Sequence, residues 1–351
     1  MVEQSVRVLI VDDSLVAREM LAQILATDPY IEVVGMATNG EEAVTMTAEL
    51  RPDLITMDIH MPKMDGLIAT ERIMAYTPTP ILVVSSSVYG EGMGRAFDAL
   101  ESGALEVIKK PEPREWADLE RIGRDVIRKV RLLSRVRVIT HIKGKRAGRI
   151  VAPPMLGVDV VRREGPALIA IGSSTGGPSA LLNILGRLPA DIPVPIVVAQ
   201  HIADGFIPGL VNWLDSGCKL RVAAAEDGAI AKPGVAHFAP TGLNLAMDGT
   251  RMRFREPTAG QLYIPSADTL FQSVARSFGR TAIGVLLTGM GADGALGLKE
   301  MHDAGASTIA QDEATSAVYG MPKAAKEIGA AGVVLPVHEI ATELERVIAE
   351  G

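Results

Sequence analysis

The sequence is poor in the residues that several classes of protein depend on. Cys218 is the single cysteine among 351 residues, so no internal disulfide forms and a zinc site built from cysteine thiolates is not expected. Aromatic residues make up only 4% of the chain, which argues against stacking surfaces for nucleic acid. The formal net charge of −7 gives no general attraction to nucleic acid or to anionic lipid.

Long apolar runs are also lacking. No run of 18 or more apolar residues occurs, and the short run near the N-terminus is broken by Asp12 and Asp13. We therefore expect no signal peptide, no insertion into a membrane and a cytoplasmic location.

Apolar runs that alternate with amphipathic stretches dominate the first part of the chain. A length of 351 residues favours two domains, and strands that alternate with helices indicate a parallel sheet covered on both faces. The sequence predicts an α/β domain over residues 1–125 with a five-stranded parallel, flavodoxin-like sheet. Its expected strands are 6–11, 31–37, 53–57, 80–85 and 105–108.

The composition changes over residues 126–164, which hold eleven Lys or Arg against Asp159 and Glu164. This stretch is interpreted as a basic linker that begins in an amphipathic helix and continues as an extended joint. The strand–helix alternation then returns and predicts a mostly parallel, doubly wound domain over 165–351, with β-hairpins within 221–256. The expected strands of its sheet are 167–172, 195–200, 281–289, 307–311 and 332–336.

Carboxylates follow two of the strands expected in the first domain. Asp12 and Asp13 follow the first strand and Asp58 the third, while Ser85 and Lys110 end the fourth and follow the fifth. Carboxyl ends of parallel strands meet at one edge, where three carboxylates repel one another unless a cation such as Mg²⁺ lies between them. Lys110 would add positive charge, and an Asp58 carboxylate can attack phosphorus to form an acyl phosphate.

The segments LIVDDS, TMDIHMPKMDGL, VVSSS and VIKKP resemble the receiver domain of two-component response regulators over about the first 120 residues. The resemblance implies that Asp58 accepts a phosphoryl group from a histidine kinase. It also implies Mg²⁺ held by Asp13 and Asp58 with Asp12 nearby, Lys110 in contact with the phosphoryl group, and Ser85 as the hydroxyl that senses it. The second domain would then be the output.

The stretch LIAIGSSTGG, residues 168–177, predicts a strand, a tight turn and the start of a helix. Neither glycine pattern of a phosphate-binding loop fits, because Pro178 stands where a lysine is required and the glycine spacing fails. The pattern G-x-S-x-G fits residues 172–176 and makes Ser174 a candidate nucleophile beside Ser173, which has no assigned role.

A base and an orienting carboxylate follow two further strands. His201 comes directly after the strand 195–200, and Asp293 lies in the glycine-rich LLTGMGADGALG. Ser174, His201 and Asp293 thus meet at one sheet edge, which supports nucleophilic catalysis. The glycines around Asp293 allow backbone N–H groups to form an oxyanion hole.

IGSSTGGP, VAQH, PSADTLFQSVA, LTGMGADGALGLKEM and AQDEATSAVYGMPKAA resemble the catalytic domain of chemotaxis-type protein-glutamate methylesterases over about 166–349. The resemblance implies Ser174 as nucleophile, His201 as base and Asp293 as its partner, with Thr175 and Met290 lining the oxyanion site and no cofactor for the esterase. It implies methylated cytoplasmic domains of chemoreceptors as substrates, and glutamine deamidation as a second activity. Phosphorylation of Asp58 would release a receiver that covers this site.

Two departures from the family pattern leave the substrate open. Ile202, Ala203 and Asp204 replace the Met-Pro-Pro that the family commonly has after the histidine, and GLNLAM at 242–247 lacks a histidine often found there. One alternative is therefore a catalytically altered docking or signalling module of another chemosensory pathway. A regulator that binds nucleic acid through 126–164 is disfavoured by the few aromatics and the absence of a helix-turn-helix pattern.

Overall fold

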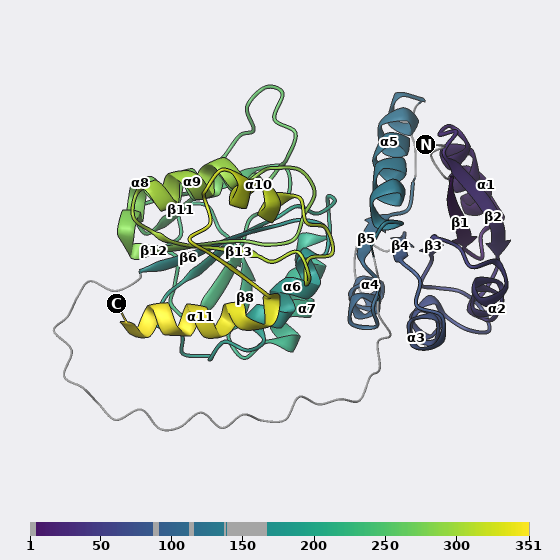
Figure 1. Ribbon diagram of the computed structural model, residues 1–351, viewed down its shortest axis with the longest axis horizontal. Coiled ribbons are helices and arrows are strands. Elements are labelled where there is room, and N and C mark those ends of the chain that lie inside the picture. The colour runs from purple at the N-terminus through teal and green to yellow at the C-terminus, as the bar shows by residue number, and fades with distance from the viewer. Residues whose placement is uncertain (1–4, 87–90, 112–115, 137, 139–166, 351) are drawn as a thin grey trace.

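Two parallel β-sheets, one in each half of the chain, organise the protein. The computed structural model describes residues 5–86, 91–111, 116–136, 138 and 167–350. Figure 1 shows the two α/β units next to each other, with the N-terminal unit in purple and blue and the C-terminal unit in teal to yellow.

The N-terminal unit has five parallel strands in the order β2-β1-β3-β4-β5. This is the flavodoxin-like α/β sheet predicted from the sequence. Its strands are β1 (Val6–Val11), β2 (Ile31–Ala37), β3 (Leu54–Met57), β4 (Ile81–Ser85) and β5 (Glu106–Lys109). Its helices are α1 (Leu15–Ala26), α2 (Gly40–Leu50), α3 (Gly66–Tyr76), α4 (Glu91–Glu101) and α5 (Trp116–Leu133).

Alternate residues of β1 supply the cores on the two faces of this sheet. Val8 and Ile10 are fully buried in the core that includes Val130 of α5, together with residues of α1. Leu9 is buried on the other face, in the core that includes Ile73 of α3. Because successive side chains of a strand point to opposite faces, an apolar run without alternation requires helices on both sides.

The C-terminal unit has seven parallel strands in the order β14-β13-β12-β6-β7-β9-β8. They are β6 (Leu168–Ser173), β7 (Ile196–Gln200), β8 (Arg221–Ala224), β9 (Val235–Phe238), β12 (Ala282–Leu286), β13 (Ser307–Gln311) and β14 (Val333–Leu335). The helices α8 (Ala267–Phe278), α9 (Ala295–Asp303) and α10 (Met321–Glu327) cover one face, while α6 (Gly177–Leu185), α7 (Ile207–Gly217) and α11 (Val337–Glu350) cover the other (Figure 1). A short 3-10 helix spans Gly279–Thr281.

The segment 221–256 contains a hairpin, as the sequence predicted, but its other strands do not form one. Within the described residues, its one pair of antiparallel strands is β10 (Asn244–Asp248) with β11 (Arg251–Arg255). β8 and β9 instead pair in parallel and extend the main sheet beyond β7. The connection between them is fastened to the hairpin, since the amide of Gly228 donates to the carbonyl of Met252. Short apolar segments do not reveal strand direction, which this long-range contact helps to set.

The two units pack through α4 and α7. The Phe97 ring of α4 meets Phe206 edge-on at 6.2 Å and stacks on Trp213 at 5.7 Å between ring centroids. All three side chains are buried. The receiver-like unit therefore contacts the second unit through a small aromatic cluster, here called the Phe97 cluster (Phe97, Phe206 and Trp213).

The predicted linker begins as a helix. α5 continues to Leu133, past the predicted boundary after residue 125, and residues 139–164 lie outside the described residues. In the described part of the chain, no helix has the length and apolar character needed to cross a bilayer.

Candidate functional site

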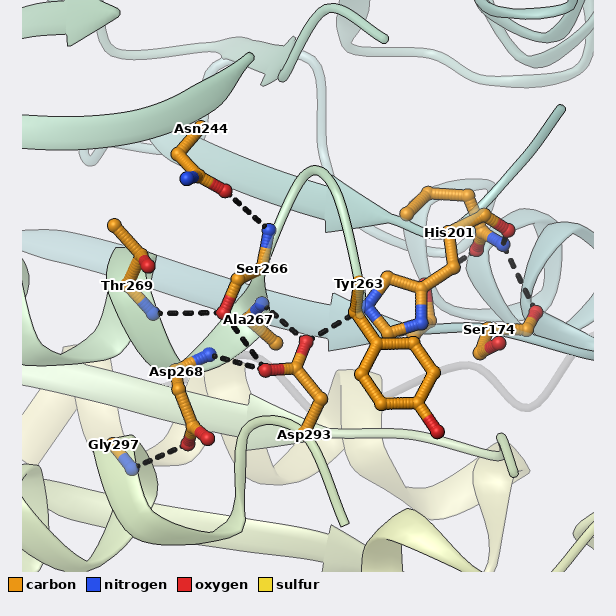
Figure 2. A network of polar contacts seen from close by, with 12 residues as sticks. Ser174, His201, Asn244, Tyr263, Ser266, Ala267, Asp268, Thr269, Asp293 and Gly297 are labelled. Carbon is orange, nitrogen blue, oxygen red and sulfur yellow. Dashed lines mark hydrogen bonds and ion pairs between the residues drawn. The ribbon is translucent and has the colours of Figure 1, made fainter. Parts of the chain in front are cut away.

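Three neighbouring strands of the second sheet carry the three residues of the predicted esterase site. β12, β6 and β7 are adjacent and parallel. Ser174 follows β6, His201 follows β7, and Asp293 lies in the loop after β12. The structure therefore brings Ser174, His201 and Asp293 to one sheet edge (Figure 2).

Ser174 lies on a tight turn between β6 and α6. Its amide donates to the carbonyl of Thr288 at 3.0 Å, and its side chain is half-buried. A Cβ added at Gly289 would lie 2.6 Å from the Cβ of Ser174, closer than real side-chain atoms approach. Only glycine at this position lets the β12 loop come so near the candidate nucleophile.

His201 lies between Ser174 and Asp293, which Figure 2 shows on opposite sides of its ring. Its Nε2 is 2.8 Å from Oδ2 of Asp293. Its Nδ1 is buried and has no hydrogen-bond partner among the described residues. The carboxylate fixes the proton on Nε2, so Nδ1 keeps a lone pair on the side of Ser174.

Tyr263 stacks on the His201 ring. The ring centroids are 4.9 Å apart and the planes differ by 9°. Such a parallel contact restricts rotation of the imidazole and shields one of its faces from solvent. No motif or spacing points to this residue, because Tyr263 and His201 are distant in the chain.

Asp293 is buried against the start of α8. One oxygen, Oδ1, accepts from the Ser266 hydroxyl at 2.8 Å and the Asp268 amide at 3.3 Å, and Oδ2 accepts from the Ala267 amide at 2.7 Å. Burial alone would raise the pKa of Asp293, but the hydrogen bond and charge of His201 and the donors of Ala267 and Ser266 outweigh it and lower the pKa. The amino end of α8 thus holds this carboxyl as an anion.

Asp268 joins the amino ends of two helices beside the site. It lies in the first turn of α8, and its carboxylate accepts from the amide of Gly297 in α9 at 2.7 Å. Burial raises the pKa of Asp268 to about 6, with the charge of Asp293 adding to the shift and backbone donors of α9 opposing it.

Thr175 and Met290 are the two residues expected from the sequence to line an oxyanion site. Both line, with Ser174 and His201, a cavity of about 1210 Å³ that the β5–α5 face of the N-terminal unit closes. The Thr288 hydroxyl donates to the carbonyl of Thr175 at 2.9 Å and so restrains the orientation of that carbonyl group. Ile202, Ala203 and Asp204, the three residues that replace the family's usual loop after the histidine, also line this cavity.

The second cluster is acidic and lies in the N-terminal unit. Carboxylate oxygens of Asp12, Asp13 and Asp58 lie within 4.8 Å of one another. Lys110 Nζ is 2.7 Å from Asp12 Oδ2 and 3.1 Å from Asp58 Oδ2. Carboxylate oxygens are the ligands that Mg²⁺ prefers, so the donor set fits this ion.

Burial and the contacts among these charged groups shift the pKa values in this cluster. Burial raises the pKa of Asp58, with Lys110 opposing and Asp12 adding to the effect. Burial would lower the pKa of Lys110, but the hydrogen bond to Asp12 and the charge of Asp58 raise it overall. Ser85 is buried at the end of β4, and its carbonyl accepts from the amide of Lys110 at 2.8 Å. All four side-chain positions predicted around Asp58 therefore lie at this edge.

Sequence reasoning missed the supporting residues. Ser266 follows Pro265 and precedes an acid in the first turn, a pattern typical of a helix start, yet nothing in it points to Asp293. Gln200 directly precedes His201, and its buried side chain was not anticipated.

Comparisons with known proteins match both units of the chain. A family model described as CheB methylesterase matches residues 169–344, and one described as response regulator receiver domain matches 8–118. The chain is 46% identical over 338 residues to protein-glutamate methylesterase/protein-glutamine glutaminase 2 of Anaeromyxobacter dehalogenans, covering 96% of each chain. It is 45% identical to the corresponding protein 1 of Syntrophus aciditrophicus over 345 residues, 97% of each. The crystal structure of the Thermotoga maritima CheB methylesterase catalytic domain is 37% identical, with a TM-score of 0.49, over 53% of this chain and 100% of that one.

Proposed function

The chain belongs to the CheB methylesterase family, and from this premise we propose that it hydrolyses glutamyl methyl esters on cytoplasmic helices of chemoreceptors through Ser174, His201 and Asp293. It is a carboxylic ester hydrolase whose relatives are named protein-glutamate methylesterase/protein-glutamine glutaminase. Deamidation of receptor glutamines by the same site is part of the proposal.

The proposed reaction is acyl transfer through a glutamyl-enzyme. His201 Nδ1 takes the proton of the Ser174 hydroxyl as Oγ attacks the ester carbonyl, and amides of Thr175 and Met290 donate to the oxyanion. The carbon–methoxy bond breaks, and His201 returns the proton so that methanol leaves. Water, deprotonated by the same nitrogen, then breaks the Oγ–carbonyl bond and restores Ser174. With a glutamine substrate the leaving group is ammonia.

One observation carries this proposal. The imidazole of His201 has one nitrogen bound to Asp293 at 2.8 Å, while the other is buried, without a partner among the described residues, on the side of Ser174. A buried nitrogen without a hydrogen bond destabilises the fold, so its presence points to a functional role. Here the nitrogen can accept a proton from the serine. The reaction needs no metal or organic cofactor in this scheme.

The receiver unit supports regulation by phosphorylation. We propose that a histidine kinase supplies the phosphoryl group to Asp58, and that Asp13 and Asp58, with Asp12 nearby, hold Mg²⁺, whose charge offsets that of the phosphoryl group. Lys110 pairs with Asp58 and also lines the cavity above Ser174. Phosphorylation of Asp58 would change the ion pair of Lys110 and thereby alter the receiver surface that borders the cavity. Loosening of the contact between the two units would then admit a receptor helix. The enzyme would act in the cytoplasm.

Methanol release from methylated receptor tests the proposal. Ser174→Ala should lose methanol release and labelling by a serine-reactive fluorophosphonate, whereas Ser179→Ala, exposed in α6, should keep both. Full methanol release by Ser174→Ala would overturn the mechanism. A chain that binds receptor but neither reacts with the phosphonate nor releases methanol would instead be a docking module.

A further inference from the structure

A buried polar pair connects the strands that carry Ser174 and His201. Ser173, the last residue of β6, and Gln200, the last residue of β7, are register partners with 0% and 2% exposure. The Ser173 hydroxyl donates to Oε1 of Gln200 at 2.6 Å. Neither side chain takes part in the acyl-transfer steps, and buried polar groups of this kind are expensive unless fully paired.

The two hydrogens of the Gln200 amide go to the backbone of the reacting residues. Nε2 donates to the carbonyl of Ser174 at 2.9 Å and to the carbonyl of His201 at 2.8 Å. Because both partners are carbonyl oxygens, they accept only from the NH₂ group, and the Ser173 hydroxyl then pairs with Oε1. The orientation of the amide is thus determined on both sides.

We propose that Gln200, oriented by Ser173, is a positioning residue that sets the separation of Ser174 and His201 by binding both of their carbonyl groups. The inference rests on the proposed roles of Ser174 and His201.

The backbone amides of Ser174 and His201 already have hydrogen-bond partners. The Ser174 amide donates to the carbonyl of Thr288 at 3.0 Å, and the His201 amide donates to the carbonyl of Ser173 at 2.9 Å. Gln200 therefore restrains the backbone of both residues relative to each other, because the carbonyls of Ser174 and His201 accept from the same side-chain amide. A Cβ at Gly177 would lie 2.1 Å from Oε1 of Gln200, so α6 begins with a residue that leaves room for this amide.

The position of the pair explains why its loss should affect reactivity. Nucleophile and base must lie within hydrogen-bond distance, and a shift of about 1 Å costs up to about 100-fold in rate. Without the amide, Ser174 keeps its bond from the Gly177 amide at 2.8 Å, whereas the His201 carbonyl loses the partner that the structure gives it. The base is then the residue free to move.

Fluorophosphonate labelling of Ser174 and methanol release, both measured on the full chain, test this inference. Gln200→Met should slow labelling by about 10- to 100-fold and lower kcat with little change in KM. Ser173→Ala should have a smaller effect of the same kind, about 3- to 10-fold, because the amide loses its fixed orientation. Ser273→Ala is the control, since it removes a hydroxyl of 2% exposure that bonds within α8 and to β10.

The double variant Ser173→Ala/Gln200→Met separates positioning from stability. Gln200→Met leaves the Ser173 hydroxyl buried without a partner, and the added Ser173→Ala change removes that hydroxyl and restores the stability lost there. We therefore expect its melting temperature to rise above that of Gln200→Met while labelling stays at the Gln200→Met rate. Labelling that recovers together with stability, or labelling by Gln200→Met at the wild-type rate, would overturn the inference.

Failure of the proposed function gives a different result. A wild-type chain that the phosphonate does not label would refute the serine mechanism itself. Labelling without methanol release would refute the substrate but leave the positioning role testable. If Gln200→Met does not fold, the Ser173→Ala variant provides the test. Labelling of Ser173→Ala at the wild-type rate would then contradict the proposal.

Discussion

At the scale of single residues, the reactivity proposed for Ser174 depends on which nitrogen of His201 carries a proton. Asp293 binds Nε2, so the acceptor nitrogen is Nδ1. Every donor around Asp293 matches an ionised carboxylate: each of its oxygens accepts two hydrogen bonds. In the proposed reaction, Asp293 both orients the ring and stabilises the imidazolium that forms.

Asp293→Asn should lower kcat and phosphonate labelling by about 1,000- to 10,000-fold. Both oxygens of Asp293 accept hydrogen bonds in the wild type, so in either orientation the NH₂ group of the asparagine faces other donors. If NH₂ faces His201, the ring must place its proton on Nδ1 and can no longer accept from Ser174. Rates measured at several pH values should stay low throughout, and a loss of less than tenfold would contradict the role of Asp293.

At the scale of elements, the amino ends of α8 and α9 are joined through carboxylates. Asp293, just before α9, binds the start of α8, and Asp268, at the start of α8, binds the start of α9. This exchange stabilises orphan amides at both helix ends. Burial raises the pKa of Asp268, and the nearby charge of Asp293 adds to this shift, whereas the hydrogen bond and charge of His201 keep the pKa of Asp293 low.

Stability should depend on pH through Asp268. Its pKa is about 6 in the folded protein against an ordinary 3.8, so between these values the folded state binds more protons than the unfolded state. The contribution is complete below about pH 3.8 and is lost as pH rises through about 6. Because Asp268 is partly exposed, screening reduces it to roughly 1 kcal/mol, or about 2–4 °C.

Asp268→Asn keeps an acceptor for the Gly297 amide but does not titrate. The melting temperature of the variant relative to wild type should therefore rise between pH 4 and pH 7, as followed by circular dichroism. A constant difference over this range would show that Asp268 is ionised in the folded protein throughout.

At the scale of the whole molecule, the receiver unit lies against the mouth of the esterase site. The Phe97 cluster joins α4 to α7, and β5 and α5 close the cavity that contains Ser174. The contact between units is a local aromatic packing beside a polar cavity. Such an arrangement suits an interface that opens when Asp58 changes its charge.

Phe97→Ala should raise methanol release by the unphosphorylated chain about fivefold or more, and phosphorylation should then stimulate it less. The variant removes the ring that meets both Phe206 and Trp213. Tyr76→Ala, which changes an 83% exposed side chain of α3, is the control. Activities are compared with and without a small phosphodonor and Mg²⁺. Unchanged basal activity together with unchanged stimulation would refute the covering role of the receiver.

Much of the fold could be predicted from local patterns. Buried parallel strands produce continuous apolar runs, so the strands of both main sheets were recognisable except β8 and β9, whose direction depends on contacts with the β10–β11 hairpin. Ser174, His201, Asp293 and the residues around Asp58 follow strands, and parallel strand ends converge. Tyr263 and Gln200 could not be found this way, because their roles come from contacts that spacing does not encode.

The sequence by itself determined the two α/β units, the acidic cluster and the candidate nucleophile, because strand periodicity and strand-end chemistry are local properties. Only the tertiary structure decided that Nδ1 of His201 faces Ser174, that α8 holds Asp293, and that Ser173 orients Gln200 between two carbonyl groups. It also placed the receiver over the esterase cavity. These features depend on distances between residues far apart in the chain, which are set only when the sheets and helices pack.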